Sequence, residues 1–230
     1  MSQATQSPAK QTHHLRIWLV VGACLIYCVL LRVLPYALTA MGAQNDWFSQ
    51  NFPWSLTPIL AVGMFAGAMF SNRYAAAGLL LAALIASDVG IWLASGHIDW
   101  AFYPGTPFNY LCLLGTILLG YTLRNDRSWI KPIGTGVLAS VIYFLVSNFG
   151  SWLTLAEYTK DLNGLIQCYV SALPFFRNLL AGTCLGTVVL FCPVILNAVA
   201  PLQQQEGQLV HAAPHHAHCC QCAQRHCTQK

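Results

Sequence analysis

The sequence YAAAGLLLAALIASDVGIWLA, residues 74–94, decides how the rest of the chain is interpreted. It is long and apolar enough to cross a membrane as a helix. Asp88 is its only ionisable side chain apart from Tyr74. Placing a carboxylate in hydrocarbon costs about 2.5–3.5 kcal/mol on insertion scales, so such a residue is expected to face protein, water or a ligand. Asp88 is therefore the first candidate for a functional residue.

The composition indicates an integral membrane protein. Of the 230 residues, 56% are hydrophobic and only 8% are charged, whereas soluble domains carry about 25% charged residues. We expect the net charge of +4 to reflect loops that face anionic lipid, not nucleic-acid binding. The apolar segments predict an all-α, polytopic membrane protein with about six transmembrane helices. These segments are Ile17–Leu34, Leu56–Phe70, Tyr74–Ala94, Asn109–Leu123, Pro132–Phe149 and Leu179–Val199.

The distribution of Lys and Arg predicts the orientation, because cytoplasmic loops carry an excess of both. With both termini inside, eight of the eleven Lys and Arg residues lie on the cytoplasmic side and three, Arg32, Lys160 and Arg177, on the outer side. The predicted organisation is a polar N-terminal tail over 1–16, a membrane domain over 17–200 and a cytoplasmic tail over 201–230.

Two smaller patterns predict local structure. Residues 162–173 are amphipathic and precede Pro174, which predicts a short outer helix that ends at the proline. Gly63 with Gly67, and Gly182 with Gly186, have the GxxxG spacing that lets two membrane helices approach closely. Packing within the chain is the simpler interpretation of both pairs, and docking of a transmembrane partner protein is the alternative.

A few polar residues are expected at one depth in the outer half of the membrane. Together they predict a pocket for a small molecule that opens to the outside, where the guanidinium fork of Arg177 would suit a carboxylate or phosphate. The alternative is that Asp88 and Arg177 form an ion pair that only holds two helices together. The candidate substrate-binding residues are Asp88, Asn148, Trp152, Arg177 and Asn178.

The sequence does not favour an enzyme. His97 is the one histidine between the first and last apolar segments, and Asp88 is the one carboxylate within them. A general acid–base pair or a catalytic metal site needs more such groups at membrane depth. We expect no catalytic residues.

The C-terminal tail is rich in imidazole and thiol groups, which zinc, copper, nickel and cobalt prefer as ligands. The irregular spacing beyond Cys219 and Cys222 favours a flexible chelating tail over a rigid finger. Adventitious metal binding by a terminal extension is the alternative. The candidate metal ligands are His215, His216, His218, Cys219, Cys220, Cys222, His226 and Cys227.

Several motifs resemble an uncharacterised bacterial family of six-helix integral membrane proteins: Ser87-Asp88, Ser147-Asn148-Phe149-Gly150 and Ala172-Leu173-Pro174-Phe175-Phe176-Arg177-Asn178. The resemblance implies a multi-pass protein of the bacterial inner membrane and no assigned activity. More loosely, the six-helix plan is similar to the substrate-binding components of energy-coupling-factor transporters, which bind vitamins or metal ions from outside. The leading hypothesis is binding or transport of a vitamin-like or metal-containing solute. A metal-handling protein and a non-transporting membrane scaffold are the alternatives.

Overall fold

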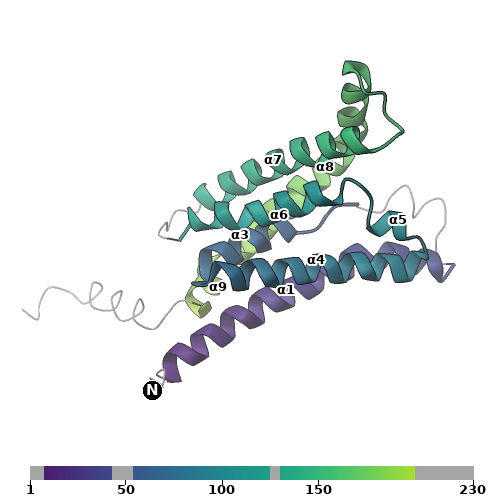
Figure 1. Ribbon diagram of the computed structural model, residues 1–230. Coiled ribbons are helices and arrows are strands. Elements are labelled where there is room, and N and C mark those ends of the chain that lie inside the picture. The colour runs from purple at the N-terminus through teal and green to yellow at the C-terminus, as the bar shows by residue number, and fades with distance from the viewer. Residues whose placement is uncertain (1–7, 43–53, 125–129, 200–230) are drawn as a thin grey trace, which may run out of the picture.

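All regular structure is helical in the parts of the chain that the computed structural model describes, residues 8–42, 54–124 and 130–199 (Figure 1). Four of its segments are long and apolar enough to cross a membrane, which indicates a membrane protein. These segments are Leu15–Ala40, Arg73–Ser95, Ile130–Thr154 and Leu162–Leu190. The helices are α1 (Pro8–Ala40), α3 (Ile59–Met69), α4 (Arg73–Ser95), α5 (Ile98–Ala101), α6 (Thr106–Tyr121), α7 (Ile130–Thr154), α8 (Leu162–Leu190) and α9 (Pro193–Val199).

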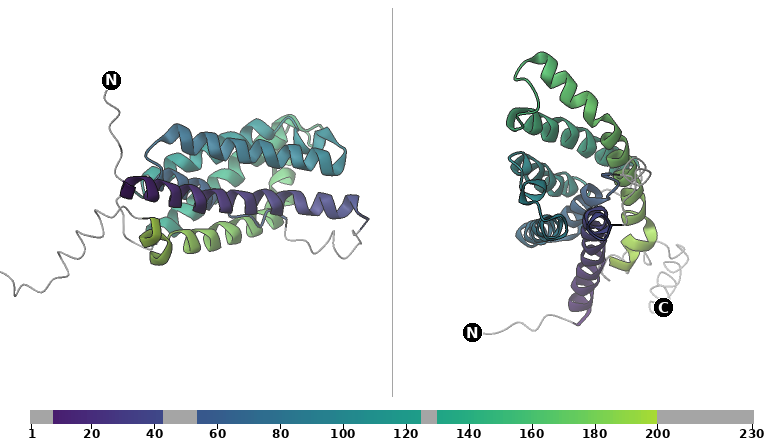
Figure 2. Two further views of the ribbon diagram at one scale, coloured as in Figure 1. Left: turned by 90° about the horizontal axis from the view of Figure 1, so that it is seen from below. Right: turned by 90° about the vertical axis from the view of Figure 1, so that its right-hand side faces the viewer.

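The longer helices alternate in direction. α1 and α4 lie side by side and run the same way, since the Trp18 ring contacts Phe70 just before α4 and Arg32 contacts Asp88 further along both helices. α7 also runs this way, and α3, α6 and α8 run the opposite way. The start of α1 and the short α9 therefore lie at the same end of the bundle (Figure 2).

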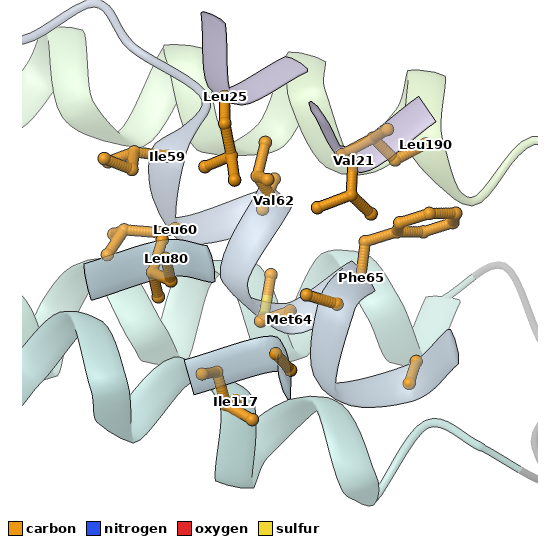
Figure 3. Packing of buried hydrophobic residues seen from close by; sticks show 14 of the residues in the cluster. Val21, Leu25, Ile59, Leu60, Val62, Met64, Phe65, Leu80, Ile117 and Leu190 are labelled. Carbon is orange, nitrogen blue, oxygen red and sulfur yellow. The ribbon is translucent and has the colours of Figure 1, made fainter. Parts of the chain in front are cut away.

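α3 is the centre of the bundle. Ten of its eleven residues are buried, as expected of a helix that is hydrophobic on every side. Figure 3 shows its side chains against those of the surrounding helices, including Val21 of α1, Leu80 of α4 and Leu190 of α8. The Phe65 ring also meets Phe191 edge-to-face, with the ring centroids 5.6 Å apart.

The second predicted span is only partly helical. α3 has eleven residues and is therefore about 16 Å long, roughly half of the hydrocarbon thickness. Trp54–Thr57 are not helical, and the proline at position 58 lies at the N-terminal boundary of the helix. α6 is also short, with 16 residues. Two of the six predicted spans are thus shorter than a full crossing.

Glycines allow the close contacts of α3 with its neighbours. A Cβ at Gly67 would lie 2.2 Å from the carbonyl oxygen of Ile117, and one at Gly120 would lie 2.1 Å from that of Met64. On α8, a Cβ at Gly186 would lie 2.4 Å from the Cβ of Pro58. Both predicted GxxxG pairs therefore pack against helices or loops of the same chain, as the simpler interpretation expected.

Three predicted boundaries differ from the structure. The separate amphipathic helix over 162–173 is wrong: α8 continues from Leu162 to Leu190 with Pro174 inside it. It bends along its length (Figure 2), because proline removes one backbone hydrogen bond without ending a helix that neighbours support. The last apolar segment is split between α8 and α9. α1 begins at Pro8, within the predicted tail over 1–16.

Candidate functional site: a charged cavity between the helices

Asp88 pairs with a residue of α1. Arg32 Nη2 donates to Asp88 Oδ1 at 2.7 Å, and the Tyr110 hydroxyl of α6 donates to Oδ2 at 2.5 Å. The Asp88 side chain is 2% exposed. A buried carboxylate requires an opposite charge and hydrogen-bond donors, and Asp88 has both. The predicted alternative, an ion pair between Asp88 and Arg177, is wrong.

The close approach of α1 to α4 explains this pairing. A Cβ at Gly90, two residues after Asp88, would lie 2.8 Å from a methyl group of Val33, the residue after Arg32, so the backbone of α4 packs closely against the side chains of α1 at this point. Arg32 Nη1 donates to Ser87 Oγ at 2.8 Å, and Ser87 Oγ in turn donates to the carbonyl of Leu84. The Ser87-Asp88 dipeptide thus holds two nitrogens of one guanidinium.

A cavity of about 750 Å³ lies beside this pair, between α1, α3, α4, α6, α7 and α8. Aliphatic and aromatic side chains form most of its wall, with the charges of Arg32 and Asp88 set into it. Rings also contact one another there: the ring centroids of Tyr36 lie 6.1 Å from those of Trp54 and 6.0 Å from those of Trp100. The aromatic lining residues are Tyr27, Tyr36, Trp54, Trp100, Tyr103, Tyr110, Tyr143, Phe144, Phe175 and Phe176.

The N-terminal end of α3 opens on the same cavity. Trp54–Ile59 line it, and Ser55 has a φ of 65°, which turns the chain into the bundle. The first backbone hydrogen bond of the helix is from Val62 N–H to the Pro58 carbonyl, and no described side chain caps this end. The amides before Val62 therefore have no acceptor within the helix, as at any helix N-terminus.

The five predicted binding residues are only partly brought together. Asn148 lines the cavity with Asp88, although its Nδ2 donates within its own helix to the Phe144 carbonyl. Asn178 Nδ2 donates to the carbonyl of Trp54 at 2.9 Å and so holds the segment before α3. Asn178, Trp152 and Arg177 are not among the lining residues. Trp152 Nε1 donates to the Thr159 carbonyl, and Arg177 is exposed on α8.

Sequence reasoning missed Arg32 and the tyrosines. Arg32 was assigned to the outer side, but it is the one charged residue in the apolar part of α1, and that was the available signal. Tyr103 precedes α6 and accepts a hydrogen bond from Asn109 Nδ2. Burial raises the pKa of the Tyr103 hydroxyl. Tyrosine alone carries no such signal, because it is common at membrane interfaces.

No group of three or more His, Cys, Asp or Glu side chains that could hold a metal lies within the described residues. The eight predicted metal ligands from His215 to Cys227 lie outside those residues. Metal binding by the tail stays a prediction.

Comparison with known proteins gives a family and no activity. A family model matches residues 12–204, and its description is a family of unknown function, DUF6580. The chain belongs to this family. The match covers every helix that lines the cavity and ends before the His- and Cys-rich tail. Neither a curated protein nor a solved structure matches the chain.

Proposed function

We propose that this DUF6580 protein binds a small solute in the cavity between its helices. The observation that carries the proposal is an ion pair with a buried carboxylate on the wall of a cavity of about 750 Å³, at a depth where charges are costly. Ion pairs that only join helices do not need a cavity beside them. Binding sites for small molecules typically measure about 300–1,000 Å³ and combine aromatic walls with a few polar groups.

The broken second span supports the same proposal. Non-helical backbone at membrane depth is tolerated where it is buried in protein or lines a water-filled cavity. Trp54–Pro58 precede a helix of only eleven residues and line this cavity. Discontinuous helices of this kind form the solute sites of many membrane transporters.

We further propose that the protein lies in the bacterial inner membrane with both termini in the cytoplasm. Alternation of helix directions and the excess of Lys and Arg on one side support this orientation. Asp88 is closer to the end than to the start of α4, so the cavity would lie in the outer half of the membrane. Reporter fusions at Asn125 and after Gln208 should report cytoplasm, and a fusion at Glu157 the outside.

The sequence has no Walker motif, so the chain does not itself use ATP by that route. We therefore propose a solute-binding component that acts alone or with a transmembrane partner protein, and we propose no catalytic role.

Blocking the cavity tests the proposal. Ser147 lines the cavity on α7, whereas Leu145, two residues earlier, is 49% exposed and does not line it. Full-length protein purified in mild detergent should yield a bound solute on denaturing extraction. Ser147→Trp should abolish this solute, and the matched control Leu145→Trp should retain it. An equal yield of solute from both variants, or no solute from folded wild-type protein in its native host, would refute binding in the cavity.

The tail supports a second candidate, handling of a soft or borderline metal ion. Nine His and Cys residues fall between His211 and Cys227, beyond the segment that the family model matches. We propose that they chelate Zn²⁺, Cu⁺, Ni²⁺ or Co²⁺. Metal analysis of the full-length protein and of a variant truncated after Gln204 should show one tightly bound metal that only the full-length protein retains. Equal metal content of the full-length and truncated proteins would show that the tail holds no metal tightly, and only adventitious binding would remain.

A further inference from the structure

The charge exposed in the cavity is positive. Asp88 is 2% exposed, and each of its oxygens already accepts a hydrogen bond, one from Arg32 and one from Tyr110. The Arg32 side chain is 30% exposed and lines the cavity. Both residues line the cavity, and an arriving solute therefore meets more of the guanidinium than of the carboxylate. Asp88 acts here as a positioning residue.

Arg32 keeps hydrogen-bonding capacity for a ligand. A guanidinium has five N–H donors, and the hydrogen bonds to Ser87 Oγ and Asp88 Oδ1 use two of them. These contacts fix the plane of the group, because Ser87 Oγ donates to the Leu84 carbonyl and presents a lone pair to Arg32. A fixed guanidinium with free donors suits the two oxygens of a carboxylate.

Two further features of the wall favour an anion. The uncapped N-terminus of α3 opens on the cavity and brings a partial positive charge of about +0.5. Thr106, 9% exposed, also lines the cavity, and its hydroxyl has no hydrogen-bond partner within the described residues. The wall thus offers donors that the protein itself leaves unused.

We infer that the solute is a monocarboxylate with an aromatic or similarly planar body, and that its carboxylate binds Arg32. The inference rests on the proposed solute-binding function. Arg32 and Asp88 neutralise each other, so a bound monoanion leaves one net negative charge, which the α3 terminus partly offsets. A phosphate dianion would leave two, at a much higher electrostatic cost in a poorly solvated site. The aromatic lining suits a flat apolar body.

Four probes that share one ring system test the charge class: 2-naphthoate, 2-naphthamide, 2-naphthylmethylamine and 2-naphthyl phosphate. Their dissociation constants are measured by calorimetry on full-length protein in detergent, stripped of bound solute. We expect the carboxylate to bind at least about tenfold more tightly than each of the others. The amide and the amine lack a charged acceptor for Arg32, and the phosphate dianion brings a second negative charge that the site does not offset. Equal or tighter binding of the amide, amine or phosphate overturns the inference.

Variants assign the preference to Arg32. Arg32→Lys keeps the charge but not the fork and should weaken naphthoate binding about tenfold. The double variant Arg32→Gln with Asp88→Asn leaves no unpaired charge, so it should fold and bind naphthoate and naphthamide equally. Arg73→Gln removes an exposed guanidinium outside the cavity and should change nothing. A double variant that still prefers the carboxylate overturns the inference.

The two proposals fail in different ways. A solute that is extracted from wild-type protein, is lost in Ser147→Trp and carries no carboxylate overturns the carboxylate inference alone. If no solute is extracted and none of the four probes binds folded protein, the proposed binding function fails and the inference fails with it.

Discussion

The two ends of α3 are built in opposite ways. At the C-terminal end, Arg124 Nε donates to the Gly67 carbonyl at 3.1 Å, and its Nη2 donates to that of Phe70. The side chain of Arg124 also lies over the Tyr121 ring, 4.4 Å from its centroid. At the N-terminal end no described side chain caps the amides, and the segment before the helix lines a cavity. One end of the same short helix is closed by the protein and the other is left open.

This difference separates stability from the proposed function. A cation over the last carbonyls complements the helix dipole and satisfies groups that would otherwise need water. The open end forgoes an equivalent cap, although the chain uses such caps elsewhere: the Asn72 side chain accepts from Tyr74 N–H at α4, and the Asp161 side chain accepts from Gly164 N–H at α8. Changes at the closed end should therefore alter folding, and changes at the open end should alter ligand binding as well.

The largest effect is expected at the ion pair beside the open end. Arg32→Gln leaves Asp88 buried without a counter-charge and should cost about 3–5 kcal/mol in the free energy of unfolding. Asp88→Asn should cost less, because the Arg32 side chain is 30% exposed and keeps access to water. The double variant should recover most of the stability. Thermal unfolding in detergent measures all three, and equal losses from both single changes would contradict this asymmetry.

At the closed end, Gly67→Ala should destabilise the protein by about 1–3 kcal/mol or more, the usual cost of overpacking. The new Cβ would meet the backbone oxygen of Ile117, which cannot rotate away. Gly115→Ala in α6 is the matched control, since a Cβ there has no described neighbour within 4 Å. It should be neutral or slightly stabilising. Equal unfolding temperatures of the two variants would show that α3 and α6 are not in this contact.

Apolar length and composition predicted the membrane class and most of the helices, and the cost of a buried charge singled out Asp88. The two prolines at positions 53 and 58 favour an extended entry to the second span, but the predicted span from Leu56 to Phe70 still starts before Pro58, whereas α3 begins only at Ile59. Pro174 does not end a helix, because membrane helices tolerate proline where neighbouring groups satisfy the freed backbone carbonyl.

The partner of Asp88 was missed for a different reason. The predicted topology places Arg177 at a similar depth to Asp88, but depth does not specify which helix face a residue occupies or which helices are neighbours. Arg32 reaches Asp88 because α1 and α4 run in the same direction with Gly90 against Val33. That contact depends on the rotation of two helices about their axes, which the apolar runs do not encode.

A smaller effect is expected from the cap at the closed end. Arg124→Gln removes charged donors to the carbonyls of Gly67 and Phe70 and should cost about 1 kcal/mol, since the side chain is partly exposed to solvent. The affinity for the solute or for 2-naphthoate should stay unchanged. Arg73→Gln, which removes another exposed guanidinium, is the control for charge alone. A loss of affinity in Arg124→Gln would show that the two ends of α3 are coupled, and the separation of stability from binding would fail.

The smallest effect is expected at a helix N-terminus that the protein does cap. Asp161 Oδ1 accepts from Gly164 N–H at 2.8 Å and from Thr159 Oγ1 at 2.7 Å, and these hydrogen bonds hold the pKa of Asp161 below its ordinary value. A lowered pKa in the folded state means that the charged cap stabilises the protein fully above the unfolded pKa, about 3.9, and that this contribution is lost as the pH falls through the folded value.

The unfolding temperature of wild-type protein should therefore exceed that of Asp161→Ala by a constant amount from neutral pH to about pH 5, and the difference should shrink below about pH 4. Asp161→Asn keeps a capping oxygen without a charge, so its advantage over Asp161→Ala should not depend on pH. Solute affinity should be the same in all three proteins, because this end of α8 does not line the cavity. A difference between wild type and Asp161→Ala that grows toward low pH would contradict the lowered pKa. An altered affinity would show that helix ends remote from the cavity also influence binding, and the open end of α3 would no longer be distinctive.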